Sequence, residues 1–298
     1  MKKIVSLLLV FLLMASLSGI AVAQKGRITV GSKGFTEQLI VGNMMAILLE
    51  ENGYDVDYRA SLGTVVAWGA LTAGQIDVYM EYTGTAWLVH LGHTSILPRE
   101  EEYQKVRAES AELGLLWLND MPINNTYALA MREDQAEALG IETLSDLAEY
   151  VRNQEGRVSL ASDFEFYSRP DGVIGLMKEY EFAFHPAQIK TMAFGLTHQA
   201  LKEERVDVAM VFGTDAQNAR FNFRVLEDDQ NFFPVYDLAP VIRQEVANRH
   251  PEVVRLLNRL VATIPDADTM RELNAMVDID KRDPEDVAQE WLEQHGLI

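Results

Sequence analysis

The chain of 298 residues contains no cysteine, and this absence excludes several chemistries at once. Disulfide bonds, a thiol nucleophile and a lipid-modified cysteine at a mature N-terminus all require a thiol. Histidine is also scarce: His90 and His93 lie three residues apart, but a glycine separates them and no carboxylate ligand stands nearby. We therefore expect no metal site and no cofactor. Since a Gly-x-Ser-x-Gly motif is also missing, the sequence predicts that the protein is not an enzyme.

Basic residues are few compared with acidic ones, with 26 Lys and Arg against 45 Asp and Glu. Removing Lys2 and Lys3 changes the formal net charge from -19 to -21, because residues 1–23 contain no acid. Nucleic acid is therefore excluded as a partner, since its phosphates would be repelled. The charge does not exclude a small anionic or zwitterionic ligand bound in a locally positive cleft.

Long apolar runs are missing after residue 23. The first 23 residues have a basic start, an apolar stretch at 4–13 and the small residues Ala21-Val22-Ala23, which predicts a signal peptide cleaved near Ala23. A membrane anchor is the alternative, but the run is short and Ser16 and Gly19 interrupt it. An exported protein with neither cysteine nor anchor is expected in a bacterial periplasm, and not as a lipoprotein.

The remaining residues, about 275, suffice for two α/β domains. The first part predicts the order β-α-β-α-β, hence a parallel sheet, with strands at 27–31, 54–59 and 76–80, a helix at 36–51, and a second helix capped by Ser61 or Thr64 and ending at Gly74. The pattern resumes with strands at 127–131, 157–161 and 206–212 and helices at 145–153 and after Pro170. From about Leu238 we expect helices that pack on the first part, at 241–250, 251–264, 268–277 and 284–295.

Residues 70–85, ALTAGQIDVYMEYTGT, match residues 200–215, ALKEERVDVAMVFGTD. Tyr82 in the first segment aligns with Phe212 in the second, and both follow a predicted buried strand. We interpret the match as two similarly built lobes, each with an aromatic ring at the carboxyl end of a strand, where open α/β sheets bind ligands. Ordinary similarity between helix-turn-strand units is the alternative.

Two basic residues lie at predicted helix starts. Lys33 belongs to GSKGFTEQ, which lacks the spacing of a phosphate loop but suits a general anion site; a solvated surface lysine is the alternative. Arg169 of FYSRPDG could bind a carboxylate in a bidentate manner through its guanidinium. An ion pair with Asp171 or Glu165 is the alternative.

Aromatic residues fall into two groups. We expect Trp68, Tyr79 and Trp87 to lie in the core, whereas Tyr82 and Phe212, each next to turn residues, should face a cleft. Several rings around one point are what a quaternary ammonium group requires, since it has no N–H to donate.

These segments together resemble the substrate-binding proteins of osmoprotectant ABC importers, which bind glycine betaine, carnitine or choline. The resemblance covers essentially the whole mature chain through GSKGFTEQ, GQIDVYMEYTGT, FYSRPDG, VFGTDA and EDDQNFFPVYDLAPVIR. It implies an α/β, two-lobed periplasmic-binding-protein fold of type II with the ligand cleft between the lobes. The expected division is 1–23 signal peptide, 24–125 first lobe, 126–233 second lobe and 234–298 return to the first lobe.

The resemblance also implies a binding site. Its aromatic box falls on Tyr82, Tyr127, Phe212 and Tyr236, its carboxylate contacts on Lys33, Thr85 and Arg169, and Asn125 helps to shape the box. Phe212 departs from the tyrosine expected at that place, which affects affinity more than ligand class.

The implied function is capture of a quaternary-ammonium osmoprotectant for import, by a monomer that works with ABC permease subunits in the inner membrane. The alternative is a choline- or amino-acid-binding protein of the same fold.

Overall fold

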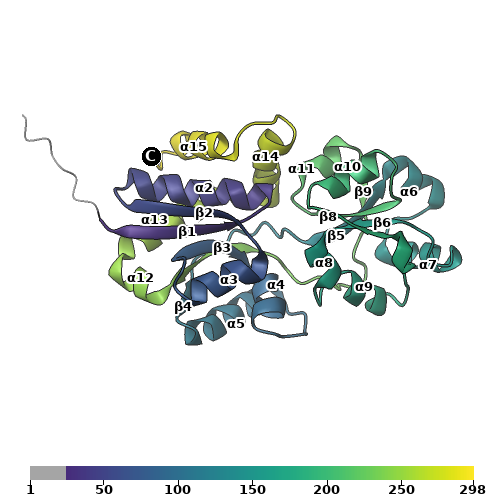
Figure 1. Cartoon of the computed structure of the whole chain (residues 1–298), viewed down its shortest axis with the longest axis horizontal. Helices are drawn as coiled ribbons and strands as arrows, with labels where there is room; N and C mark the ends of the chain where they lie inside the picture. Colours follow the sequence, from purple (N-terminus) through teal and green to yellow (C-terminus); the bar gives the residue numbers. More distant parts are fainter. Residues whose placement is uncertain (1–24) are drawn as a thin grey trace, which may run out of the picture.

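The computed structural model describes residues 25–298, and the predicted signal peptide lies outside these residues. They form two five-stranded sheets, each flanked by helices, which we call the first and the second lobe (Figure 1). The first sheet has the order β2-β1-β3-β10-β4, with β1 Arg27–Lys33, β2 Asp55–Leu62, β3 Val78–Tyr82, β4 Leu115–Trp117 and β10 Leu238–Arg243. The second has the order β7-β6-β8-β5-β9, with β5 Tyr127–Arg132, β6 Leu160–Ser162, β7 Ile189–Thr191, β8 Val208–Phe212 and β9 Phe223–Val225.

Helices cover both faces of each sheet. Those before the second lobe are α2 Thr36–Glu51, α3 Thr64–Thr72, α4 Thr83–Thr85, a π-helical turn at Ala86–His90 and α5 Arg99–Glu112. The second lobe contains α6 Glu133–Leu139, α7 Leu144–Asn153, α8 Phe164–Ser168, α9 Val173–Glu179, a 3-10 turn at Pro186–Gln188, α10 Leu196–Lys202 and α11 Ala216–Arg220. The chain then forms α12 Gln244–Arg249, α13 Pro251–Val261, α14 Ala267–Asp278 and α15 Pro284–Gln294.

The first sheet confirms the predicted parallel β-α-β-α-β unit, because β1 pairs in parallel with both β2 and β3. The expected helix at 241–250 is wrong in its first three residues, because α12 begins only at Gln244. Residues Leu238–Arg243 form β10, which runs antiparallel between β3 and β4. A strand that is buried on both faces has a continuous run of apolar residues. The periodicity of such a run does not distinguish it from a buried helix. Pro240 lies within this strand, where its carbonyl accepts a hydrogen bond from the Leu118 N–H at 3.0 Å.

Two predicted helix starts are also wrong. Gly63, not Ser61 or Thr64, is the N-cap of α3, and Thr64 is its first residue. Pro170 does not begin a helix either: Arg169 is the C-cap of α8, and α9 starts only at Val173. Arg169 has extended backbone angles, as a residue before proline should.

The two lobes repeat one unit, as the match between residues 70–85 and 200–215 predicts. In the first copy α3 leads into β3, and in the second α10 leads into β8. The aligned aspartates have the same role: Asp77 accepts a hydrogen bond from the Thr29 N–H, and Asp207 accepts one from the Ser159 N–H, both at 2.8 Å. The repeat brings β3 and β8 to their ends at Tyr82 and Phe212, one in each lobe.

The C-terminal helices lie against the first lobe, where α13, α14 and α15 all contact α2 (Figure 1). Helix α14 also touches the second lobe through α11. The Asn274 side chain donates a hydrogen bond of 3.0 Å to the Thr214 carbonyl. This helix therefore lies against both lobes.

Two segments link the lobes, near Asn124-Asn125 and near Phe233-Pro234 (Figure 1). They run beside one another, because the Asn125 N–H donates to the Tyr236 carbonyl at 3.0 Å and the Tyr236 N–H donates to the Asn124 side chain at 2.9 Å. The core predictions hold in the first lobe, where Trp68, Tyr79 and Trp87 are buried.

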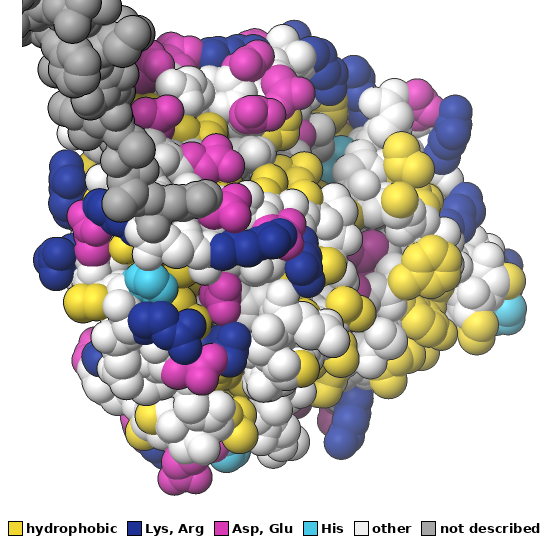
Figure 2. All heavy atoms as spheres, turned by 60° about the vertical axis from the view of Figure 1, so that its left-hand side comes forward, with side chains coloured by type: hydrophobic (Ala, Val, Ile, Leu, Met, Phe, Trp, Pro, Cys, Tyr) yellow, Lys and Arg dark blue, Asp and Glu magenta, His cyan; other side chains and the backbone are white. Residues whose placement is uncertain are grey.

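Charged side chains of both signs are interspersed on the face drawn in Figure 2, so the negative excess is not gathered into one patch there. Within residues 25–298, no helix is long and apolar enough to cross a membrane.

Candidate functional site

A cavity of about 260 Å³ lies between the lobes, at the carboxyl ends of β1, β3 and β8 and the start of β5. All eight residues of the predicted binding site line it: Lys33, Tyr82, Thr85, Asn125, Tyr127, Arg169, Phe212 and Tyr236. Residues beyond that prediction also line it, among them Phe35, Ser61, Thr64, Asp163, Glu165 and Phe194. The sequence motifs, far apart in the chain, therefore converge on one space. Their contact with a ligand remains a prediction.

Six aromatic rings border the cavity, four of them expected. The Tyr127 ring centroid lies 4.9 Å from that of Phe212 and 5.6 Å from that of Tyr236. The remaining two rings extend this group: Phe35 lies 5.4 Å from Phe212, and Phe194 lies 4.8 Å from Phe212. Phe35 belongs to the GSKGFTEQ motif and could have been predicted from its place there. Phe194 lies in a loop between β7 and α10 that carries no motif.

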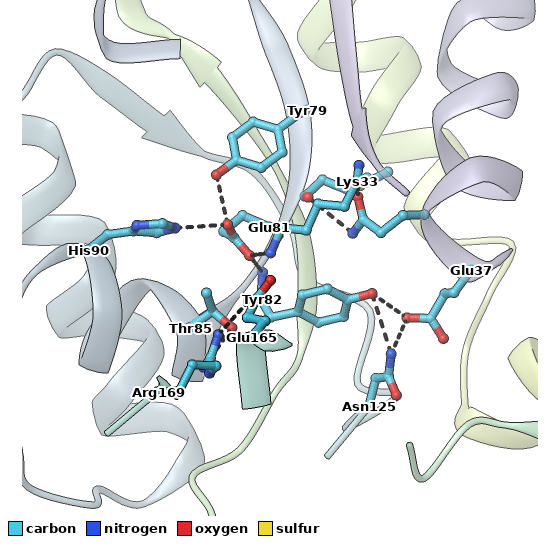
Figure 3. A network of polar contacts seen from close by, with 12 residues as sticks. Lys33, Glu37, Tyr79, Glu81, Tyr82, Thr85, His90, Asn125, Glu165 and Arg169 are labelled. Carbon is cyan, nitrogen blue, oxygen red and sulfur yellow. Dashed lines mark hydrogen bonds and ion pairs between the residues drawn. The ribbon is translucent and has the colours of Figure 1, made fainter. Parts of the chain in front are cut away.

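Lys33 is buried, with 4% of its surface exposed, so the solvated-lysine alternative is wrong. Its ammonium lies 2.5 Å from the Glu81 carboxylate and 5.1 Å from the Tyr82 ring centroid (Figure 3). The sequence did not indicate Glu81, because only the parallel register of β1 and β3 brings the two side chains together.

Glu81 is a fully buried acceptor with four neighbours. Besides Lys33, it accepts hydrogen bonds from the Tyr79 hydroxyl and the Tyr82 N–H, both at 2.7 Å, and contacts the His90 ring at 3.0 Å. Burial alone would raise the pKa of Glu81, but the charge of Lys33 and the contact with His90 outweigh it and lower this pKa to about 2. The Lys33 ammonium is thus already neutralised by a permanent partner.

Arg169 forms both of the ion pairs that the sequence offered. Its Nε and Nη2 atoms bind the two Asp171 oxygens at 2.9 and 2.6 Å, and its Nη1 lies 3.1 Å from Glu165. The Tyr236 hydroxyl also hydrogen-bonds to Asp171. Across the cleft, Nη2 lies 3.3 Å from the Thr85 hydroxyl of the first lobe (Figure 3). Arg169 therefore lies at the cavity and contacts both lobes. Asp171 and Glu165 balance the positive charge of its guanidinium.

Glu37 is a second buried carboxylate that the prediction missed. It accepts hydrogen bonds from the Tyr82 hydroxyl at 2.7 Å and the Asn125 amide at 2.9 Å (Figure 3). It also accepts one from the Thr214 hydroxyl at 2.7 Å. Burial raises its pKa above the ordinary value. Its donors come from the first lobe, the connection and the second lobe, so Glu37 fixes the Tyr82 ring relative to all three. The signal was the Glu-Gln pair of GSKGFTEQ at the start of α2.

Glycine is required where the Tyr82 turn meets the second connection. A Cβ atom on Gly84 would lie 2.7 Å from the Val235 carbonyl oxygen and 2.8 Å from the Pro234 ring. Thr83 next to it donates a hydrogen bond to the same carbonyl at 2.9 Å. This close packing holds Tyr82 and Thr85 at the cavity and beside the second connection.

Two α/β lobes joined by paired connections, with an aromatic cavity at strand ends between them, define a two-lobed solute-binding protein. Within that class, the family described as the substrate binding domain of ABC-type glycine betaine transport system (OpuAC) matches residues 26–294. The chain therefore belongs to this family.

Two curated relatives and one solved structure illustrate the membership. The glycine-betaine-binding protein of Pseudomonas aeruginosa is 40% identical over 289 residues, which cover 95% of this chain and 93% of the relative. The ergothioneine transport permease/ergothioneine binding protein EgtU of Helicobacter pylori is 36% identical over 91% of this chain, which spans only 48% of that relative. The apo structure of YehZ from Escherichia coli superposes with a TM-score of 0.65 at 33% identity, covering 91% of this chain and 99% of YehZ.

Proposed function

We propose that this protein captures a small quaternary-ammonium zwitterion, glycine betaine or a similar osmoprotectant, and delivers it to ABC permease subunits in the inner membrane. The observation that carries the proposal is the group of six rings around the cavity between the lobes. A trimethylammonium group has no N–H to donate, so it is held by ring faces, each of which contributes about 0.5–2 kcal/mol when desolvated.

The carboxylate end of the ligand would then meet Thr85, Arg169 and Lys33. Both cations already have buried partners, Asp171 and Glu81, so they offer N–H donors more than unbalanced positive charge. Hydrogen bonds from ionised donors remain favourable in such a setting. The site therefore suits a ligand that carries both charges, as a betaine does.

Further parts of the proposal rest on the family and the sequence. We place the protein in the periplasm, as a monomer released from a signal peptide near Ala23, that binds without catalysis. Its lobes would span residues 24–125 with 234–298, and residues 126–233.

Calorimetry of the chain from residue 24 onward tests this function. Glycine betaine, carnitine, proline betaine, ergothioneine, choline and proline should be titrated in parallel. We expect the carboxylated trimethylammonium compounds to bind, and proline, which has no methylated nitrogen, to bind weakly or not at all. Binding of proline alone would support an amino-acid receptor instead, and preference for choline would support a choline receptor. No binding of any quaternary ammonium compound would contradict the proposal.

A further inference from the structure

Arg169 holds two carboxylates in different ways. Asp171 is 1% exposed at its side chain, binds two guanidinium nitrogens and also accepts from the Tyr236 hydroxyl. Glu165 is 38% exposed at its side chain, and within residues 25–298 its carboxylate has one hydrogen bond, to Arg169 Nη1. Asp171 is therefore a fixed partner, whereas Glu165 is held by a single contact that solvent can reach.

Glu165 also lies where a ligand would need to bind. Its side chain lines the cavity together with Thr85 and Arg169 (Figure 3). The Arg169 Nε and Nη2 atoms are occupied by Asp171 and Thr85, which leaves Nη1 as the donor for an incoming anion. A ligand carboxylate at Nη1 would meet the negative charge of Glu165 at hydrogen-bonding range.

The other acids near the two cations are not comparable. Glu81 has four neighbours and no exposed surface, so it does not leave Lys33. Asp163 lines the cavity, but it caps α8 by accepting a hydrogen bond from the Phe166 N–H. Glu165 follows two residues later on the same short helix and caps nothing, so its side chain is free to swing out without unfolding α8.

We propose that Glu165 is a specificity-determining residue that lies at the carboxylate subsite of the cavity and competes with ligand carboxylates for Arg169, an inference that rests on the proposed function. Nη1 carries two N–H groups, and Glu165 accepts a hydrogen bond from one of them. A zwitterion therefore either displaces the Glu165 side chain or binds its own carboxylate beside that negative charge, and both oppose binding. Choline has no carboxylate, so it leaves this pair intact and gains from the nearby negative charge. Glu165 therefore reduces the ratio of betaine affinity to choline affinity.

Calorimetry with glycine betaine and choline on the parent, Glu165→Gln and Glu165→Asp tests the inference. In Glu165→Gln the competing charge is gone, and the dissociation constant for betaine should fall about two- to fivefold, the effect of a partly exposed ion pair. The dissociation constant for choline should rise in the same variant. Glu165→Asp keeps the charge but shortens its reach, so its betaine affinity should lie between those of the parent and Glu165→Gln.

The matched control is Glu149→Gln, which removes the same charge from an exposed position on α7. Its ratio of betaine to choline affinity should equal that of the parent. A parent-like ratio in Glu165→Gln, or an equal rise in Glu149→Gln, would overturn the role of Glu165 while leaving the proposed function standing. If the parent binds neither compound, the proposed function fails, and this inference fails with it.

Discussion

Tyr82 combines two tasks in one side chain. Its ring borders the cavity, and its hydroxyl binds Glu37, a carboxylate that also reaches Asn125 and Thr214. Ring and hydroxyl can be separated by substitution, because phenylalanine keeps the first and removes the second.

We expect Tyr82→Ala to weaken betaine binding by about 1–3 kcal/mol, since it removes one of the six rings that border the cavity. Tyr82→Phe should cost less, because the ring remains while Glu37 loses one of its three donors. Phe212→Tyr should bind about as well as the parent. Calorimetric affinities of the three variants provide the measurement. Parent-like binding by Tyr82→Ala would show that the Tyr82 ring does not hold the ammonium group.

The Lys33–Glu81 pair makes a prediction about acid stability. The folded pKa of Glu81, about 2, lies below its ordinary value of 4.5. The pair therefore stabilises the fold fully above about pH 5, and this contribution, on the order of 3 kcal/mol, is lost as the pH falls toward 2.

Urea unfolding from pH 7 to pH 2 should show this loss in the parent. Glu81→Gln should be less stable than the parent at pH 7, by about 3–5 kcal/mol, because Lys33 is left buried and unpaired. The difference between the two proteins should shrink as the pH falls. A difference that stays constant from pH 7 to pH 2 would contradict the assigned charge of Glu81.

Helix α5 carries an acid in an unusual place. Glu102 is 0% exposed, and neither of its carboxylate oxygens accepts a hydrogen bond within residues 25–298. Burial, helped by the charge of Asp237, raises its pKa from 4.5 to about 7. The fold therefore favours the protonated form, and ionisation destabilises it as the pH rises from about 4.5 to 7.

Replacing Glu102 by glutamine should remove this penalty. At pH 8 we expect Glu102→Gln to be more stable than the parent by on the order of 2 kcal/mol, and at pH 4 the two should be nearly equal. Thermal or urea unfolding at both pH values checks the sign. Part of the pH dependence should survive in the variant, because burial also raises the pKa of Asp237, to about 6. Equal stability at pH 8 would show that burial does not raise the pKa of Glu102.

Elements with a clear period or motif could be predicted from the sequence, and those set by distant pairing could not. Helix α2 was predicted with its observed bounds because its apolar positions repeat regularly between two glycine turns. Strand β10 was taken for a helix because its neighbours, β3 and β4, precede it by more than a hundred residues. The candidate site divides in the same way. Lys33, Arg169 and four of the rings could be predicted because they lie in sequence motifs. The contact between Glu81 and Lys33 could not, because it depends on the register of β1 and β3.

At the scale of the whole molecule, the paired connections indicate a hinge. The lobes are linked by two adjacent segments, by Arg169 with Thr85, and by Glu37 with Thr214. The last two contacts lie at the cavity, so they depend on how far the lobes are closed.

We expect ligand to favour the closed arrangement through a hinge motion, because in the proposed site it would contact groups from both lobes. Small-angle scattering should then show a smaller radius of gyration with saturating betaine than without ligand. The matched sample contains proline at the same concentration and should leave the radius unchanged. An unchanged radius together with calorimetric proof of betaine binding would mean that the lobes are already closed before the ligand arrives.

The position of β10 has a consequence for the order in which the protein folds. All five strands of the second sheet lie between residues 127 and 225. The first sheet is complete only when residues 238–243 form β10 between β3 and β4. As a chain is made from its N-terminus, the second lobe therefore has all its strands before the first. Until β10 arrives, β4 has no partner strand and β3 presents an open edge, which is a template for association with other chains. The lobe that begins first is completed last, and a nascent chain stopped before Leu238 would be the form most prone to aggregate.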